Sequence, residues 1–174
     1  MIKATINAGR LPYDHWTLDP VAGGGRIVGE GCHWVDLIRY FAGIPIESVA
    51  CTRRDTDGQD GGTFELQFAD GSVGVLDYRT DLAADVPKET IVVSGPQGQA
   101  TIHNWTRLSS RGLGRVQIDK FRHSSQTKGH PEALSAFFAA THVGLPPIPY
   151  DEIFEVSRWA ILMQGMKASE SLKL

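Results

Sequence analysis

The chain has 174 residues, of which 41% are hydrophobic and 21% are charged, and its formal net charge is −3. Such a composition is typical of a globular protein and excludes the fibrous and disordered classes. Because the net charge is small and negative, we expect no nucleic-acid partner and no anionic membrane partner. No apolar run approaches the roughly 18 residues that a membrane-spanning helix needs.

The two cysteines, Cys32 and Cys51, are too few for a disulfide framework and are typical of a reducing compartment. The first residues lack the basic and then apolar pattern of a secretory signal peptide. We therefore expect a cytoplasmic location. Residues 1–6 already have the pattern of a strand, which fits either a chain cut from a longer one or a short natural N-terminus.

Taken in chain order, the first predicted elements are a strand over residues 1–6, a loop that ends in Gly23–Gly25, and a helix directly after these glycines. The helix has an apolar face whose members recur at helical spacing. They are Trp34, Val35, Ile38, Phe41 and Ala42. Gly43, followed closely by Pro45, predicts where the helix ends.

Strands are predicted through the middle of the chain. Alternating apolar residues on either side of Asp70-Gly71 predict a hairpin, and a second hairpin surrounds the turn at residues 95–98. The predicted strands of this region are 46–52, 64–68, 73–77, 90–94, 99–103 and 115–121.

Two helices are predicted at the C-terminal end. The first begins at residues 129–131 and turns Leu134, Phe137 and Phe138 inward. The second begins at residues 151–152, with acidic side chains at the positive end of its dipole. Six residues form its apolar stripe. They are Ile153, Phe154, Val156, Ala160, Ile161 and Met163.

A helix, then meandering strands, then helices: this order predicts one α+β domain over residues 1–174, with a largely antiparallel open sheet and helices packed on one face. The glycines before the first helix suggest a dinucleotide-binding fold, but the pattern G-x-G-x-x-G fails at Val28 when counted from Gly23. Counted from Gly112, it fails at Gln117. We therefore predict that the chain has no nucleotide-binding half of its own.

His33 is the leading catalytic candidate. It lies in the first predicted turn of the helix, and Asp36, one turn later, is spaced to hold its ring through the other nitrogen. The alternative is a half-buried histidine that caps its own helix. Glu30 also has two interpretations, an acid–base partner in the reaction or a favourable charge near a helix N-terminus.

Further candidates lie beside these residues. A cysteine nucleophile at Cys32, or a metal site built from Glu30, Cys32 and His33, is disfavoured because adjacent helical residues point about 100° apart. We therefore predict no metal. Trp16, with His15 beside it, precedes the glycines, where it either walls the same pocket or plugs the core.

The stretch GGGRIVGEGCHWVDLIRYFAG, residues 23–43, resembles a motif of the glucose–fructose oxidoreductase/inositol dehydrogenase family, also called Gfo/Idh/MocA. That motif, GGGxLxDxGxHxxDxxxxxxG, opens the C-terminal domain in the family. The matching residues are Gly23, Gly24, Gly25, Gly31, His33, Asp36 and Gly43. The Asp-Gly hairpin, the Gly-Pro-x-Gly turn and the two closing helices are similar too, so the resemblance covers nearly the whole chain.

The resemblance implies two domains in the complete protein. An N-terminal Rossmann domain, absent from this chain, binds NAD or NADP and carries the lysine of a Glu-Lys-Pro motif. The C-terminal domain, with the fold of the glucose–fructose oxidoreductase and dihydrodipicolinate reductase C-terminal domains, covers the nicotinamide and binds a sugar, polyol or related carbonyl compound. Its open sheet joins copies into dimers or tetramers.

Carried over residue by residue, the resemblance makes His33 the group that handles the proton of the reacting hydroxyl, oriented by Asp36. Gly23–Gly25 let the loop approach the cofactor. The expected substrate contacts are His15, Trp16 and Arg26. The family's aspartate, four residues before the histidine, falls on Gly29, which has no side chain, although Glu30 is adjacent.

Two hypotheses of different class follow. In the first, the chain is the substrate and oligomerisation domain of an NAD(P)-dependent oxidoreductase and is inactive by itself. In the second, it is a non-catalytic binding or assembly module that retains the family fold, as Gly29 suggests. A metal-dependent hydrolase is a third possibility, which metal analysis would test.

Overall fold

One sheet contains the eight strands of the computed structural model, which describes residues 1–55, 57–113, 125–126 and 128–173. The strands are β1 (Ile2–Asn7), β2 (Ile46–Arg54), β3 (Gly62–Phe68), β4 (Val73–Arg79), β5 (Glu89–Gly95), β6 (Gly98–His103), β7 (Arg107–Arg111) and β8 (Glu170–Lys173). Their order across the sheet is β7-β6-β5-β1-β4-β3-β2-β8. The first strand of the chain therefore lies inside the sheet, between β5 and β4.

Neighbouring strands are antiparallel throughout, except that β1 and β4 run parallel, with Ala4 opposite Leu76. The pairs β3–β4 and β5–β6 are the two predicted hairpins, and a short turn joins antiparallel strands. The predicted fold class, α+β with a largely antiparallel open sheet, is confirmed.

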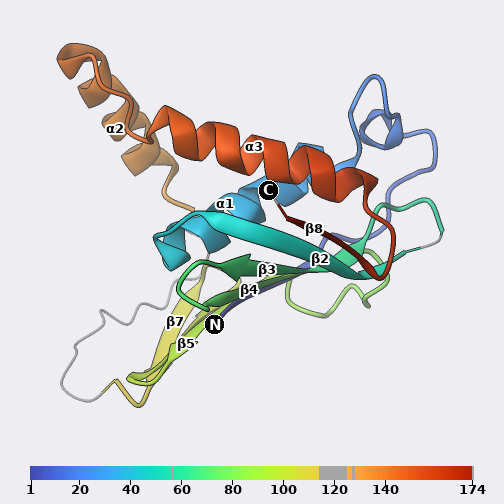
Figure 1. The fold of residues 1–174 in the computed structure, drawn as a ribbon, viewed down its shortest axis with the longest axis horizontal. Helices are drawn as coiled ribbons and strands as arrows, with labels where there is room; N and C mark the ends of the chain where they lie inside the picture. Colours follow the sequence, from blue (N-terminus) through green and yellow to red (C-terminus); the bar gives the residue numbers. More distant parts are fainter. Residues whose placement is uncertain (56, 114–124, 127, 174) are drawn as a thin grey trace.

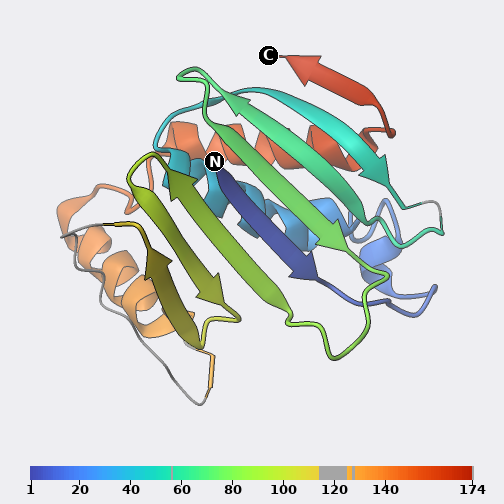
Figure 2. The same cartoon turned by 90° about the horizontal axis from the view of Figure 1, so that it is seen from below.

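Two helices, α1 (Cys32–Ala42) and α3 (Tyr150–Gly165), cover one face of the sheet and leave the other face open (Figures 1 and 2). A third helix, α2 (His130–Val143), extends away from this layer (Figure 1). Two short helical turns are η1 (Trp16–Leu18) and η2 (Ile27–Gly31). Within the described ranges, none of the helices has the length and apolar character needed to cross a bilayer.

The core lies between the two helices and the sheet face that they cover. Side chains alternate along β3 and β4, so Phe64 and Leu76 point toward the helices and are fully buried. Ile38 of α1 and Trp159 of α3 belong to the same buried cluster. Gly74 of β4 allows α1 to come this close, because a Cβ at that position would overlap the Ile38 side chain.

A buried arginine joins the two covering helices to the sheet. Nε of Arg39 on α1 lies 3.2 Å from Oε2 of Glu155 on α3, and its Nη2 lies 3.8 Å from Oε1 of Glu152. The second oxygen of Glu155 accepts a 2.6 Å hydrogen bond from the backbone N–H of Ile46, at the start of β2. These carboxylates compensate the burial of the Arg39 charge.

The predicted hairpins and the strands at the start of the chain are confirmed. β2 continues two residues beyond its predicted end, to Arg54, and two further strands, β7 and β8, were not predicted. Both are short edge strands without apolar alternation, so the pattern that identifies a half-buried strand is missing from them. The strand predicted at 115–121 falls outside the described residues.

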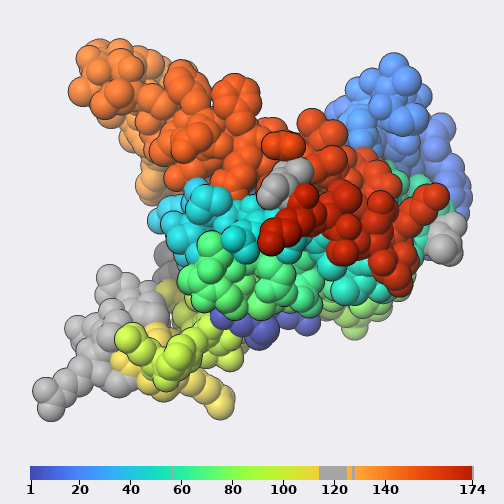
Figure 3. All heavy atoms as spheres, viewed as in Figure 1, coloured from blue at the N-terminus to red at the C-terminus, as the bar shows by residue number. Residues whose placement is uncertain are grey.

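The prediction that α2 turns its large apolar residues inward is wrong. Leu134, Phe137 and Phe138 are 59%, 56% and 62% exposed, and none of the residues of α2 is buried against the described part of the chain. Figure 3 shows α2 projecting beyond the sheet and α1. The helix was predicted correctly, but the described residues do not cover it.

The apolar stripe predicted for α3 is buried only in part. Val156, Ala160 and Met163 face the sheet as predicted, and Trp159, which the prediction omitted, lies beside them and is buried. The other predicted members are exposed. They are Ile153, Phe154 and Ile161. At 3.6 residues per turn, positions 154 and 161 lie roughly opposite the buried stripe.

Candidate functional site

The helix that carries the candidate residues begins earlier than predicted. The π-helical turn η2 runs directly into α1, so His33 lies in the second helical turn instead of the first. The N–H groups at the true start are already bonded within the chain. The Arg26 N–H donates to Oδ2 of Asp60 at 3.2 Å, and the Ile27 N–H donates to Oε1 of Gln164 at 2.9 Å. These bonds satisfy helix-terminal donors that a ligand would otherwise occupy.

The three glycines fit tightly against the chain itself. A Cβ on Gly23 would lie 2.5 Å from Cα of Thr17 and from the carbonyl oxygen of Trp16. Gly25 has a φ of +92°, its N–H donates to the Thr17 carbonyl at 3.1 Å, and a Cβ there would overlap the side chain of Gln164. Intrachain packing thus explains the glycines. The backbone N–H groups of Gly23 and Gly24 donate to the Asp19 carbonyl, so all three glycine amides are already bonded within the chain.

His33 is exposed on that outer side. One turn before it lies Gly29, also exposed, where a Cβ would come within 3.4 Å of the Thr17 methyl group. Tyr40, two turns after His33, is exposed as well. The outer strip of α1, which we define as positions 29, 33, 36 and 40, therefore begins where η1 packs against the helix.

Trp16 and His15 lie at the beginning of that strip. Trp16 is 62% exposed, and its ring centroid is 6.0 Å from that of His15, with the two rings stacked. Nδ1 of His15 accepts a 3.3 Å hydrogen bond from the Thr17 N–H and so caps η1. The alternative in which Trp16 plugs the core does not agree with this exposure.

Asp36 is half-buried on the outer strip. Burial raises the pKa of its carboxyl group, and the nearby charge of Glu152 on α3 raises it further, while His33 and Arg39 act in the opposite direction. Among the described residues, no hydrogen bond joins Asp36 to His33. The predicted support of the His33 ring by Asp36 therefore stays a prediction.

Glu30 points toward the sheet, away from the outer strip. Its Oε2 accepts a 2.5 Å hydrogen bond from the hydroxyl of Tyr78 on β4 and lies 3.6 Å from Nη2 of Arg26. Burial and the adjacent Glu30 carboxylate raise the pKa of the Tyr78 hydroxyl well above its ordinary range. Glu30 and His33 thus have different surroundings. Tyr78 was not predicted as a site residue, although it continues the inward alternation of β4.

Arg26 is almost completely buried, with 2% of its surface exposed. Its Nη1 donates to the Gly9 carbonyl at 2.6 Å and its Nη2 to the Ala8 carbonyl at 3.0 Å, and the guanidinium lies 5.4 Å from the Tyr78 ring centroid. Arg26 therefore joins the end of β1 to the helix start. Its predicted contact with a substrate stays a prediction, to which the structure adds this structural role.

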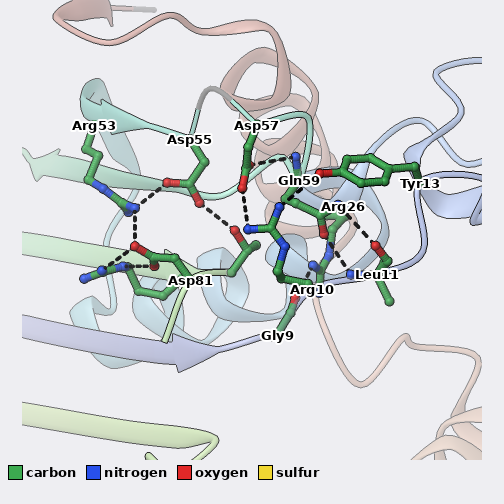
Figure 4. Close-up of polar contacts among 12 residues, drawn as sticks. Gly9, Arg10, Leu11, Tyr13, Arg26, Arg53, Asp55, Asp57, Gln59 and Asp81 are labelled. Atoms are coloured by element: carbon green, nitrogen blue, oxygen red, sulfur yellow. Dashed lines mark hydrogen bonds and ion pairs between the residues drawn. The ribbon is translucent and has the colours of Figure 1, made fainter. Parts of the chain in front are cut away.

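A polar network holds two loops at the carboxyl ends of β1, β2 and β4 (Figure 4). The side chain of Gln59, which is fully buried, accepts from the Leu11 N–H at 2.7 Å and donates to the Leu11 carbonyl at 3.2 Å. Nη1 of Arg10 lies 2.7 Å from Oδ2 of Asp57. These contacts fix the loop that leads to His15 and Trp16. The sequence did not predict them, because they join residues far apart in the chain.

Cys32 is half-buried, and burial raises the pKa of its thiol. A raised thiol pKa lowers the fraction of thiolate at neutral pH, so the residue lacks the environment of a cysteine nucleophile. In the part of the chain that the structure describes, no three His, Cys, Asp or Glu side chains are grouped so that they could hold a metal ion.

The sequence matches the family model described as the GFO/IDH/MocA C-terminal domain, over residues 1–101. The matched region includes the whole motif from Gly23 to Gly43 and most of the sheet. The chain matches no curated protein.

Several solved structures share the fold. The aldose-aldose oxidoreductase from Caulobacter crescentus, complexed with glycerol, has a TM-score of 0.75 and 18% identity over 99% of this chain and 55% of its own. Levoglucosan dehydrogenase, in complex with NADH and levoglucosan, has a TM-score of 0.72 and 16% identity over 99% of this chain and 58% of its own. The WlbA dehydrogenase from Bordetella pertussis, in complex with NADH and UDP-GlcNAcA, has a TM-score of 0.64 and 18% identity over 100% of this chain and 54% of its own. This chain thus spans little more than half the length of each.

At these identities the likeness to solved structures shows a common fold and no more. The family model adds evidence from the sequence, because residues 1–101 are more than half of the chain. Together, the matched motif, the open sheet with helices on one face and the shared fold lead to one conclusion: the chain belongs to the GFO/IDH/MocA family and corresponds to its C-terminal domain.

Proposed function

We propose that residues 1–174 form the substrate domain of an NAD(P)-dependent oxidoreductase that acts on a sugar, polyol or related hydroxy or carbonyl compound. A Rossmann domain outside these residues would bind most of the cofactor. The observation that carries the proposal is the exposure of His33 on the outer strip of α1, within the family motif. The solved relatives that hold NADH with levoglucosan or UDP-GlcNAcA support the choice of cofactor and substrate class.

A bound nicotinamide would supply the hydride chemistry, and His33 would handle the proton. A ring nitrogen of His33 takes the proton of the substrate hydroxyl during oxidation and returns it during reduction. Asp36, on the same strip, orients the ring. Trp16, with His15 behind it, offers an aromatic face to the apolar side of a sugar ring.

Gly29 changes the proton path that the family motif implies. The family's aspartate would stand one turn before His33, and here there is no side chain at that position. Glu30 does not replace it, because its carboxylate accepts the Tyr78 hydroxyl on the sheet side of the helix. Because His33 is exposed, its proton exchanges with solvent.

The open face of the sheet, opposite α1 and α3, is the surface that we propose joins two or more copies. It carries mixed polar and apolar side chains in β4 and β5, including Val75, Asp77, Thr90 and Val92, all partly exposed. Mixed faces of this kind are common in protein–protein interfaces. A dimer or tetramer in the cytoplasm, without nucleic-acid or membrane partners, completes the proposal.

A non-catalytic assembly module is the second candidate. The observation that favours it is the combination of Gly29, which removes the usual acidic side chain, with Glu30, whose carboxylate is held at Tyr78. In such a module, His33 would contribute only to the surface of α1.

The test uses the complete protein, with a panel of sugars and polyols and the nicotinamide absorbance as the readout. For the oxidoreductase, His33→Ala should lower kcat by roughly 10²-fold or more, the usual contribution of an acid–base group. Gln97→Ala, on the exposed turn between β5 and β6, is the control and should leave kcat unchanged. Full activity of His33→Ala, or failure of the complete protein to bind NADH and NADPH, would favour the assembly module.

A further inference from the structure

Residues 130–154, which we call the arm, comprise α2, its connection to α3 and the first residues of α3. In α2, as noted above, no side chain is buried against the described residues. The connection and the start of α3 add more exposed apolar surface. The contributors are Leu145, Tyr150 and Phe154, at 66–72% exposure. Figures 1 and 3 show the arm projecting from the end of α1 and α3.

The arm also encloses a groove of about 440 Å³ between α2 and the start of α3. Its walls are mostly apolar. They include Phe137, Leu145, Pro146, Pro147, Ile148 and Ile153. Exposed apolar patches of more than a few hundred Å² are rare on free globular proteins and mark sites of interaction. A helix that is apolar on all sides is normally buried. The arm is therefore built to be covered.

Charge identifies the class of partner. Among residues 130–143, Glu132 is the only Asp, Glu, Lys or Arg, and the other titratable side chains of the helix are His130 and His142. Helices that lie on membranes combine an apolar face with Lys and Arg. Because α2 carries neither Lys nor Arg, a protein surface suits the arm better than a lipid surface.

The position of the arm indicates which protein surface it is. Its inner end carries Glu152, 3.8 Å from Arg39 of α1, and the charge of Glu152 also acts on Asp36. The arm therefore meets the outer strip of α1 at the end opposite Trp16. A second domain placed over the outer strip, as the proposed function requires, would also reach the arm.

We propose that the arm is the docking surface for the nucleotide-binding domain that the proposed function places outside residues 1–174 of the same polypeptide. The solved relatives match 99–100% of this chain, arm included, and 42–46% of their own length lies outside the match (100 − 58 and 100 − 54). These solved chains thus carry, besides this fold, a further segment of nearly domain size. The inference rests on the proposed function, since that function assigns the further segment to cofactor binding.

Photo-crosslinking in the complete protein tests the docking. Phe137 is replaced by p-benzoylphenylalanine, and in a second variant Phe154 is replaced, so that a folding defect at one position does not decide the result. Gln97, exposed on the turn between β5 and β6, provides the matched control. A mixture of light and heavy isotope-labelled protein separates crosslinks within one polypeptide from crosslinks between copies.

We expect Phe137 and Phe154 variants to crosslink within one polypeptide, to peptides that precede Met1, and the Gln97 variant not to do so. Crosslinks between copies would overturn the proposal in favour of a homo-oligomer contact. The absence of protein crosslinks, or a natural protein that begins at Met1, would overturn it as well.

Hydrogen exchange gives an independent readout. In the complete protein, the amides of α2 should exchange at least roughly tenfold faster in the double variant Phe137→Asp/Phe138→Asp than in the wild type, because uncovering the helix exposes its hydrogen bonds. Unchanged exchange would contradict docking. Neither readout depends on turnover: an inactive protein with intrachain crosslinks refutes only the proposed function, and an active one with crosslinks between copies refutes only the docking.

Discussion

Residues 32–42 and residues 130–143 both form helices rich in apolar side chains, and only the first helix lies against the sheet. In α1, Val35 and Ile38 are fully buried, whereas the largest apolar residues of α2 are more than half exposed. Both helices end at a glycine with positive φ, Gly43 and Gly144. The two regions thus have the same local structure and opposite burial.

Helical periodicity therefore locates a helix without locating the surface that covers it. Apolar spacing in α2 predicts a covered helix. In the body of the molecule, which we define as the sheet, α1 and the rest of α3, the same rule is correct except at Phe41 and Ile161, which are exposed. Where the rule fails within the described residues, the covering surface must be sought elsewhere. The helix α3 passes from one region to the other and allows a direct test.

The largest expected effect separates the two sides of α3. Trp159 is 1% exposed in the body, while Ile161, two residues later, is 62% exposed. Trp159→Ala should lower the free energy of unfolding by about 3–5 kcal/mol through lost burial and a cavity, and Ile161→Ala should change it by less than about 0.5 kcal/mol. Urea unfolding of both variants measures the difference. Equal losses of unfolding free energy in the two variants would show that the difference in burial between Trp159 and Ile161 does not affect stability.

The polar contacts of the body provide the next effect. Tyr78→Phe removes the hydroxyl that donates to Glu30 and leaves the partly buried Glu30 carboxylate with the more distant Arg26 alone. A hydrogen bond to a charged group contributes about 1.5–3 kcal/mol, and we expect a loss of that size in chemical denaturation. The exposed Tyr40 of the outer strip supplies the control, Tyr40→Phe, which should be neutral. A neutral Tyr78→Phe would contradict the structural role given to Glu30.

The glycine loop tests whether the start of the helix belongs to the rigid body. Gly23→Ala places a methyl group against backbone atoms of Trp16 and Thr17, which cannot rotate away as a side chain would. We expect a loss of about 1–3 kcal/mol, typical of overpacking. Gly95→Ala, which meets no atom within 4 Å, is the control. Thermal unfolding that does not distinguish the two variants would mean that the loop is not held against η1.

The smallest effect concerns Asp36, near the place where body and arm meet. Because burial and Glu152 raise its pKa above the ordinary value of 3.8, the folded state binds its proton more tightly than the unfolded state. This contribution to stability is present at acid pH and is lost as pH rises from about 3.8 through the raised pKa. Asp36→Asn should therefore melt slightly higher than the wild type at pH 7, and the difference should vanish at low pH. Melting curves between pH 3 and pH 8 check the sign, and a lower melting temperature at pH 7 would contradict it.

Much of the fold could be predicted because its signals are local. Alternation through Phe64 and Leu66 identified β3, and the Asp70-Gly71 turn fixed the first hairpin. The parallel pairing of β1 with β4 could not be predicted, since it joins strands about seventy residues apart and no local pattern marks it. β7 and β8 escaped prediction because edge strands lack apolar alternation.

The candidate site divides in the same way. His33 and Asp36 were identified from spacing on one helix, and the structure places both on the outer strip of α1. Glu30 was named as a partner of His33, yet its carboxylate binds Tyr78, a residue 48 positions away. The π-helical turn, whose extra residue per turn changes side-chain directions, gave no signal in the sequence.

By itself the sequence determined the segments that become helix or strand, the glycine that ends α1 and the motif that marks the family, because each depends on neighbours within a few residues. Tertiary structure alone decided which charges are buried, which glycines touch the backbone and which apolar helix remains uncovered. Those properties depend on atoms brought together from distant parts of the chain, as with Arg26 at the end of β1 and Gln164 at the start of the helix.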